Sequence, residues 1–168
     1  MKTFLFATAF IVWTMTAFAV RPSTDEMAVR LGVQAWYSTH SPNPGSMDVS
    51  RLKAIYQPGV EFTNPVTSNT SAEHGVKAYA AVWQPLADSV ATLQTTPADD
   101  LQISEQGAQI VTTFTYQPQG TYKDGRPLSC HTRVSLTWER TEGFWQISRE
   151  VLTPLDSAPA KPSIATTK

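Results

Sequence analysis

Three segments in the second half of the chain alternate apolar and polar side chains with a period of two. They cover residues 110–116, 130–138 and 145–151. Successive side chains of a β-strand point to opposite faces of a sheet, so each segment predicts a strand with one apolar face. Glycine-containing turns at residues 123–126 and 142–143 predict antiparallel neighbours. Such a sheet requires a second layer of structure to cover its apolar face.

Helices in the first half of the chain are the expected cover. Ser23 caps a helix over residues 24–39 and Glu26 reaches back to the cap, which is the pattern of a capping box. After a proline-rich turn, Ser46 caps a second helix with apolar residues on one face. Residues 58–59, Pro and Gly, break that helix.

A short strand and a third helix are expected next. Residues 60–64 alternate and stop at Pro65, which predicts a strand. Residues 70–73 form a second capping box, so the third helix is expected to begin there, with His74 in its first turn. Pro85 is expected to end or kink this helix.

The N-terminus has the features of a secretory signal peptide. Lys2 precedes an apolar stretch over residues 4–18, and Ala17 and Ala19 form an A-x-A cleavage site. The stretch is shorter than the ~20 residues that a membrane-spanning helix needs. We therefore expect residues 1–19 to be removed, giving an exported, periplasmic or secreted protein without membrane contact.

The rest of the chain is expected to form one domain over residues 20–153, followed by a disordered Pro/Ala-rich tail over residues 154–168. A hydrophobic content of 41% in 168 residues is enough for one core. The net charge of -1, without a run of Lys or Arg, argues against nucleic acid as a partner. Cys130 is the only cysteine, so no intramolecular disulfide can form, and its strand position favours burial over an intermolecular bond.

Four stretches carry a family resemblance. Residues 54–56 with 60–65 resemble the entry to the first strand of the nuclear-transport-factor-2-like, SnoaL-like superfamily. Residues 75–79 resemble the start of its third helix, and residues 145–150 its closing hairpin. The resemblance covers most of residues 24–153. It implies an α+β, cone-shaped fold with N-terminal helices packed on a curved antiparallel sheet. Members of the superfamily use the cone as an isomerase, cyclase or dehydratase site, a ligand pocket or a dimer scaffold, so fold alone does not assign a function.

One chemistry that the resemblance brings to mind lacks its residues here. Ketosteroid-isomerase-type members place a carboxylate base directly before the Pro of the first strand, and a protonated acid on the penultimate strand. Asn64 occupies the first position, and an amide does not titrate near neutral pH. Residues 128–138 contain no Asp or Glu. The sequence therefore argues against an enzyme of this type.

The three histidines do not form a recognisable site. His131 shares strand parity with Arg133, opposite the apolar face, although a β-bulge would reverse this. His40 lies in a proline-rich loop and His74 at a helix start. Because their spacing is not that of metal ligands, we predict neither a metal site nor a cofactor.

Four residues are candidates for ligand binding: Asn64, Tyr79, Trp83 and Arg149. The amide of Asn64 could bind a ligand or a nearby backbone group. Tyr79 and Trp83 lie one helical turn apart on an apolar stripe, as core residues or as a ligand platform. Arg149 shares parity with Ile147, so it is expected on the apolar face as an anion-binding group. The alternative is that Arg149 extends to water or pairs with an acid.

These observations lead to three hypotheses. The leading one is a non-catalytic exported domain that binds a small, partly apolar molecule in the cone, with Asn64 and Arg149 as polar anchors. The second is a homodimeric scaffold that assembles through the polar face of the sheet. That face carries Thr113, Thr115, His131, Arg133 and Ser135. The third is a dehydratase- or isomerase-like enzyme with an atypical site around His131.

Overall fold

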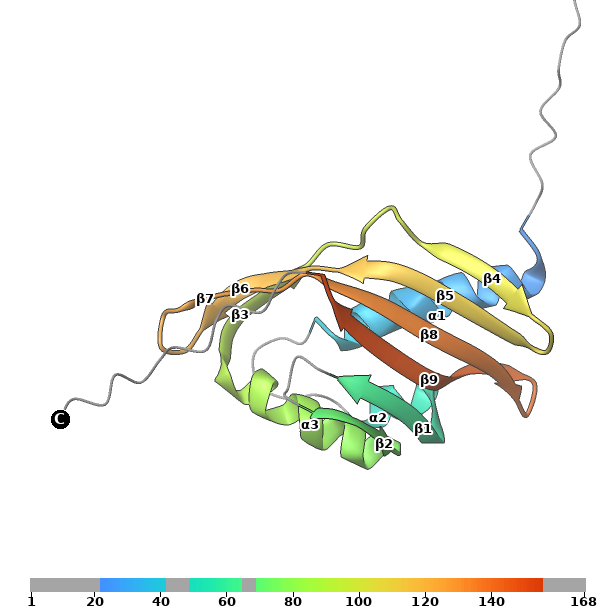
Figure 1. Cartoon of the computed structure of the whole chain (residues 1–168), viewed down its shortest axis with the longest axis horizontal. Coiled ribbons are helices and arrows are strands. Elements are labelled where there is room, and N and C mark those ends of the chain that lie inside the picture. The colour runs from blue at the N-terminus through green and yellow to red at the C-terminus, as the bar shows by residue number, and fades with distance from the viewer. Residues whose placement is uncertain (1–21, 42–48, 65–68, 156–168) are drawn as a thin grey trace, which may run out of the picture.

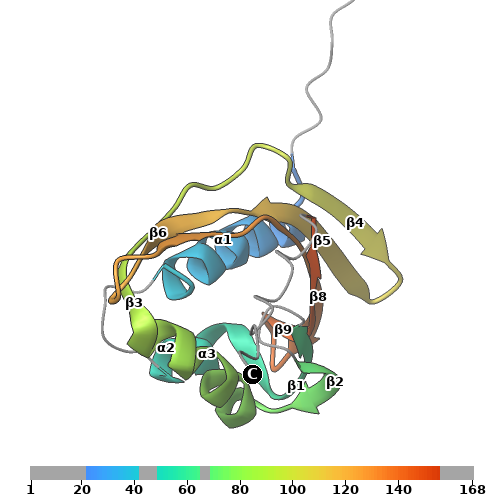
Figure 2. The same cartoon turned by 60° about the vertical axis from the view of Figure 1, so that its left-hand side comes forward.

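The computed structural model describes residues 22–41, 49–64 and 69–155. The predicted signal peptide, the cap at Ser46 and nearly all of the predicted tail lie outside these residues. The elements combine α-helices with a curved sheet, as the α+β prediction requires. Figure 2 shows the strands β5, β6 and β8 curving around the first helix, while the other two helices lie on the opposite side.

The first helix, α1 (Thr24–Thr39), begins where its cap predicts. The Ser23 hydroxyl accepts a hydrogen bond from the backbone N–H of Glu26 at 3.0 Å, which satisfies one exposed donor of the first turn. The Glu26 carboxylate, however, binds Arg30 at 2.7 Å, one turn along the helix. The predicted cap is therefore present on the serine side, and the glutamate stabilises the helix surface.

The segment before the third helix differs from its prediction. After α2 (Val49–Ile55), strand β1 (Tyr56–Asn64) runs through Pro58 and Gly59, and residues 70–73 belong to strand β2 (Asn69–His74). Helix α3 (Val76–Ser89) begins only after its N-cap residue Gly75, whose φ of 91° suits glycine. The capping-box prediction at residues 70–73 is wrong because β1 offers backbone partners to this segment. Pro85 lies inside α3, which continues past it.

Residues 90–155, the rest of the described chain, form seven strands, as the alternation predicts for the longest segments. They are β3 (Val90–Thr95), β4 (Gln102–Gln106), β5 (Gln109–Tyr116), β6 (Pro118–Tyr122), β7 (Pro127–Ser129), β8 (Thr132–Thr141) and β9 (Phe144–Pro154). One sheet has the order β2-β1-β9-β8-β5-β4, and a smaller one has the order β3-β6-β7 (Figure 1). All the pairs are antiparallel except β1 with β9.

A bulge in β9 decides which of its side chains face the core. Trp138 pairs with Ile147, but the adjacent Thr137 pairs with Arg149, so Ser148 is an additional residue on one strand. An additional residue reverses the alternation beyond it. Glu150 therefore points into the core, and Arg149 points outward.

The core forms between the three helices and the sheet, and the approach of α1 to the sheet depends on one close contact. A Cβ atom at Gly32 would lie 2.6 Å from the indole ring of Trp138. Only glycine allows α1 to approach β8 this closely. The contact places Trp36, one turn further along α1, in the fully buried part of the core.

Candidate functional site

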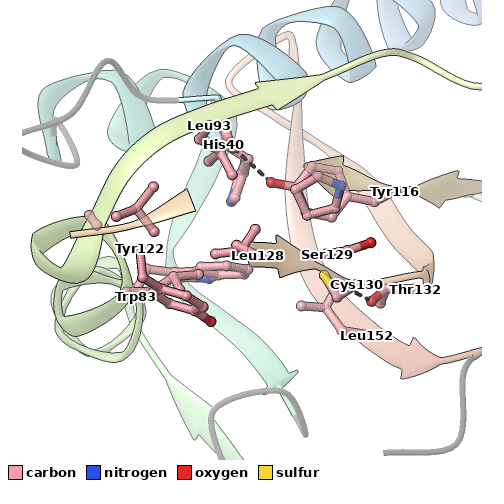
Figure 3. A pocket seen from close by; sticks show the side chains of 14 residues that line it. His40, Trp83, Leu93, Tyr116, Tyr122, Leu128, Ser129, Cys130, Thr132 and Leu152 are labelled. Atoms are coloured by element: carbon pink, nitrogen blue, oxygen red, sulfur yellow. Dashed lines mark hydrogen bonds between the residues drawn. The ribbon is translucent and has the colours of Figure 1, made fainter. Parts of the chain in front are cut away.

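A cavity opens where the two sheets meet, beyond the end of α1. It encloses about 80 Å³, which is room for several waters or a small organic molecule. Most of its wall is apolar. We call it the Trp83 cavity. The described residues that line it are His40, Trp83, Leu86, Ala87, Val90, Leu93, Tyr116, Pro118, Tyr122, Leu128, Ser129, Cys130, Thr132 and Leu152. Figure 3 shows Trp83 and Tyr122 on one side and Cys130, Thr132 and Leu152 on the other.

The indole N–H of Trp83 is a buried donor without an acceptor. The side chain is only 5% exposed, and its Nε1 atom has no hydrogen-bond partner among the described residues. A buried donor without a partner costs roughly 1–3 kcal/mol, and most native proteins avoid it. An acceptor on a bound molecule would remove this cost.

A hydrogen-bonded network of five buried side chains lies behind the cavity. We call it the Glu150 network, and it consists of Trp36, His40, Tyr56, Tyr79 and Glu150. The Glu150 Oε2 atom accepts from Trp36 Nε1 at 2.8 Å and from the Tyr56 hydroxyl at 2.5 Å. Its Oε1 atom lies 2.7 Å from the Tyr79 hydroxyl. Strands β1 and β9 and helices α1 and α3 thus meet at one carboxyl group.

His40 connects the Glu150 network to the Trp83 cavity. Its Nε2 atom lies 2.5 Å from the Tyr79 hydroxyl, and its Nδ1 atom lies 2.7 Å from the backbone oxygen of Trp36. The indole ring of Trp36 stacks on the imidazole at 4.0 Å between centroids. His40 caps the C-terminus of α1 and is buried, so the prediction that it lies in a proline-rich loop is wrong.

Burial shifts the titration of every ionisable group in the network. It raises the pKa of Glu150, although the hydrogen bonds from Tyr56, Trp36 and Tyr79 act in the opposite direction. It lowers the pKa of His40 to about 4, against a smaller opposing effect of the backbone oxygen of Trp36. Burial, and then the charge of Glu150, raise the pKa values of Tyr56 and Tyr79 well above normal. Each shift favours the uncharged form.

The four predicted ligand-binding residues have different positions. Trp83 lines the cavity, and Tyr79 is fully buried with its hydroxyl in the Glu150 network. Asn64 ends β1, where its backbone pairs with Asn69, and its side chain is outside the described structure. The predicted inward orientation of Arg149 is wrong. The bulge turns it outward, where 56% of its side chain is exposed and its Nε atom lies 3.4 Å from Glu61.

Sequence reasoning missed the centre of the network, Glu150. Strict alternation along β9 placed it on the polar face together with Ser148. The nearest available signal was the pattern of β8, where Val134, Leu136 and Trp138 fix the inward face. Nothing in the sequence of β9 marks its additional residue.

Two other reactive side chains, Cys130 and His131, do not belong to the Glu150 network. Cys130 is half-buried in the cavity wall, and His131 precedes β8 on its half-exposed side, outside the described cavity lining. The described ranges contain no group of three or more His, Cys, Asp or Glu residues that could hold a metal ion. None of the helices in these ranges is long and apolar enough to cross a membrane.

Comparison with known proteins identifies the class of fold. No protein-family model and no curated protein sequence matches the chain. Among solved structures, a proposed dehydratase of the NTF2-like family from Streptomyces avermitilis has a TM-score of 0.65 and 15% identity, over 82% of this chain and 100% of its own. An NTF2-like superfamily protein from Salmonella enterica has a TM-score of 0.62 and 17% identity, over 84% and 96% of the two chains.

A third similar structure is named for a different role. The CaMKII hub from S. rosetta has a TM-score of 0.62 and 17% identity, over 80% of this chain and 99% of its own. The chain therefore has the nuclear-transport-factor-2-like fold that the resemblance implied. At these identities the similarity establishes the fold, and the function must be argued from the site.

Proposed function

We propose that this protein binds a small, largely apolar molecule carrying one hydrogen-bond acceptor in the Trp83 cavity. The unpaired indole N–H of Trp83 carries the proposal, because a ligand acceptor would satisfy it. The apolar wall would contact the rest of the molecule.

The cavity chemistry supports binding without reaction. The described lining residues include no Asp, Glu, Lys or Arg. Both ring nitrogens of His40 are engaged with Tyr79 and Trp36, so neither is directed at a ligand. A general acid or base needs hydrogen-bond reach to the reacting group. In this proposal Trp83, in place of Asn64 and Arg149, is the polar anchor of the ligand.

The test uses two ligands of the same shape. 2-Pentanone offers a carbonyl oxygen, and 2-methyl-1-pentene places a CH₂ group at that position. We expect the indole N–H to raise the ketone-to-alkene affinity ratio by roughly fivefold over that of Trp83→Phe, for a hydrogen bond of ~1 kcal/mol. The ketone should also shift the indole N–H resonance of Trp83 in a two-dimensional NMR spectrum. The same affinity ratio in the wild type and in Trp83→Phe would contradict the proposed role of the indole.

Matched tryptophan variants separate the indole N–H from general effects. Trp83→Phe should lower the ketone-to-alkene affinity ratio while keeping the affinity for the alkene within a small factor. Trp145→Phe is the control, because the Trp145 indole donates to Asp25 at 3.1 Å and is not among the cavity residues. The control should retain the wild-type ratio.

A second proposal is a homodimer that assembles through the outer face of the large sheet. Thr113, Thr115, Arg133 and Ser135 are half-exposed on that face. Asp100 orders it, since its carboxylate binds the Thr115 hydroxyl at 2.6 Å and Arg133 at 3.1 Å. The CaMKII hub shares this fold. Sedimentation at micromolar concentration should give a dimer, and a monomer would contradict this proposal.

Export remains a proposal based on residues 1–19. Intact mass measurement of the protein recovered from its expressing cell should give a chain that starts at Val20. A mass that includes Met1 would contradict cleavage.

A further inference from the structure

The proton positions in the Glu150 network follow from which atoms can donate. The indole nitrogen of Trp36 can only donate, and its backbone oxygen can only accept. His40 Nδ1 must therefore carry a proton for its contact with that oxygen. Glu150 Oε2 is then an acceptor twice, from Trp36 and from Tyr56. These assignments leave the contacts of the Tyr79 hydroxyl to be explained.

The Tyr79 hydroxyl has one proton and three partners. The Tyr56 hydroxyl, at 3.0 Å, donates to it, so two partners remain that could each accept its proton. It lies 2.7 Å from Glu150 Oε1 and 2.5 Å from His40 Nε2. It can donate to only one of them, so the other must donate to it. The chain from carboxyl to imidazole therefore holds one additional proton, carried either by Glu150 or by His40. A shift of protons through Tyr79 interconverts the two arrangements.

The surroundings favour the arrangement without charges. Glu150 and His40 are both buried, and separated charges are costly in such an environment. The polar groups that face them are Trp36 from α1, Tyr56 from β1, Tyr79 from α3 and Tyr116 from β5, whose hydroxyl donates to the His40 backbone oxygen at 2.7 Å. No described Lys or Arg forms an ion pair with Glu150. The raised pKa of Glu150 and lowered pKa of His40 agree with this arrangement.

We infer that Glu150 is a protonated acid that donates to Tyr79, which in turn donates to a neutral His40. Because His40 lines the Trp83 cavity, its neutral form leaves the cavity wall uncharged and makes the cavity selective for uncharged ligands. Ketones, esters and ethers fit this description, and carboxylates do not. The ligand half of the inference rests on the proposed function, whereas the proton half does not depend on any ligand.

The proton half predicts a specific pH dependence of unfolding. A carboxyl whose pKa is raised in the folded protein stabilises it at low pH, and this contribution is lost as the pH rises above its unfolded pKa of ~4.3. His40, with a pKa lowered to about 4, has the opposite effect up to its unfolded value of ~6.5. The two effects cancel between these values. Above about pH 6.5, for as long as Glu150 stays protonated in the folded protein, the wild-type unfolding constant should therefore rise ~tenfold per pH unit.

Glu150→Gln is the matched variant for this experiment. Its amide oxygen can accept from Trp36 and Tyr56, and its NH₂ group can donate to Tyr79, so it reproduces the protonated acid without titrating. Its unfolding constant should be independent of pH above about 6.5. The same slope in the variant and the wild type would overturn the inference.

An NMR measurement on the wild type tests the same point without a variant. At about pH 7, long-range ¹H–¹⁵N spectra should show His40 with a proton on Nδ1 and none on Nε2. An imidazolium pattern would overturn the neutral arrangement.

The ligand half is tested with a third molecule of the same shape. Butanoate replaces the methyl group of 2-pentanone with a charged oxygen. We expect the ketone to bind at least tenfold more tightly at about pH 7, measured by the Trp83 indole resonance. Equal or tighter binding of butanoate would overturn the selectivity and leave the cavity as a ligand site. Failure of all three molecules to bind would reject the proposed function together with this selectivity, while the unfolding and NMR experiments still decide the proton half.

Discussion

Two buried tryptophans of this protein differ in whether the indole N–H has a hydrogen-bond acceptor. The Trp36 indole donates to Glu150 within a network in which each donor has an acceptor, whereas the Trp83 indole has no acceptor among the described residues. His40 connects the two regions, since it belongs to the Glu150 network and also lines the Trp83 cavity. This contrast is the basis of our proposal that the first region stabilises the fold and the second binds a ligand.

Removal of the carboxyl group should have the largest effect. Glu150→Ala leaves Trp36 and Tyr56 without their acceptor, removes the donor to Tyr79 and creates a cavity, so we expect a loss of about 3–5 kcal/mol in the free energy of unfolding. Urea denaturation measures this loss. Glu150→Gln should lose far less, because the amide can maintain the three contacts. Similar losses for both variants would contradict the hydrogen-bond pattern.

Acid titration of Glu150→Gln isolates the contribution of His40. Because the pKa of His40 is lowered to about 4, the unfolded chain binds a proton that the folded protein rejects as the pH falls from ~6.5. The variant should lose about 3 kcal/mol of stability between those two pH values. The wild type should change much less over this interval, because Glu150 acts with the opposite sign. A flat profile in the variant would mean that His40 titrates normally.

A change at Gly32 should disturb the Glu150 network more than the Trp83 cavity. The Cβ atom of Gly32→Ala would overlap the Trp138 ring, so α1 must move away from β8. Overpacking of this kind costs about 1–3 kcal/mol. The Trp36 indole resonance should shift more than that of Trp83, which contacts α1 through the ring of His40 at its end. Equal shifts of both resonances would show that the two regions are not separable.

The smallest effect is the direct comparison of the two tryptophans. Trp36→Phe and Trp83→Phe remove the same atoms, but only the first breaks a hydrogen bond. We expect Trp36→Phe to be less stable than Trp83→Phe by about 1–2 kcal/mol. Thermal or urea unfolding of the two variants, without ligand, measures the difference. Equal stability would indicate that the Trp83 indole is satisfied in solution.

Local patterns predicted much of the fold but little of the site. The alternation at Val134, Leu136 and Trp138 depends only on the geometry of a strand, and it predicted the inward face of β8. The Trp83 side chain was a candidate because it lies on the apolar stripe of α3. Glu150 and the contact of His40 with Tyr79 were missed because the partners are distant in sequence.

The sequence by itself determined the elements whose signals are local: the cap at Ser23, the turns near Gly125 and Gly143, and the alternating strands. Tertiary structure decided the rest. Residues 70–73 became a strand because pairing with β1 outweighed a local helix signal. The additional residue at Ser148 arises where β9 pairs with both β8 and β1, and it places Glu150 inside and Arg149 outside. Register is a property of paired strands, so no reading of one strand alone could assign these positions.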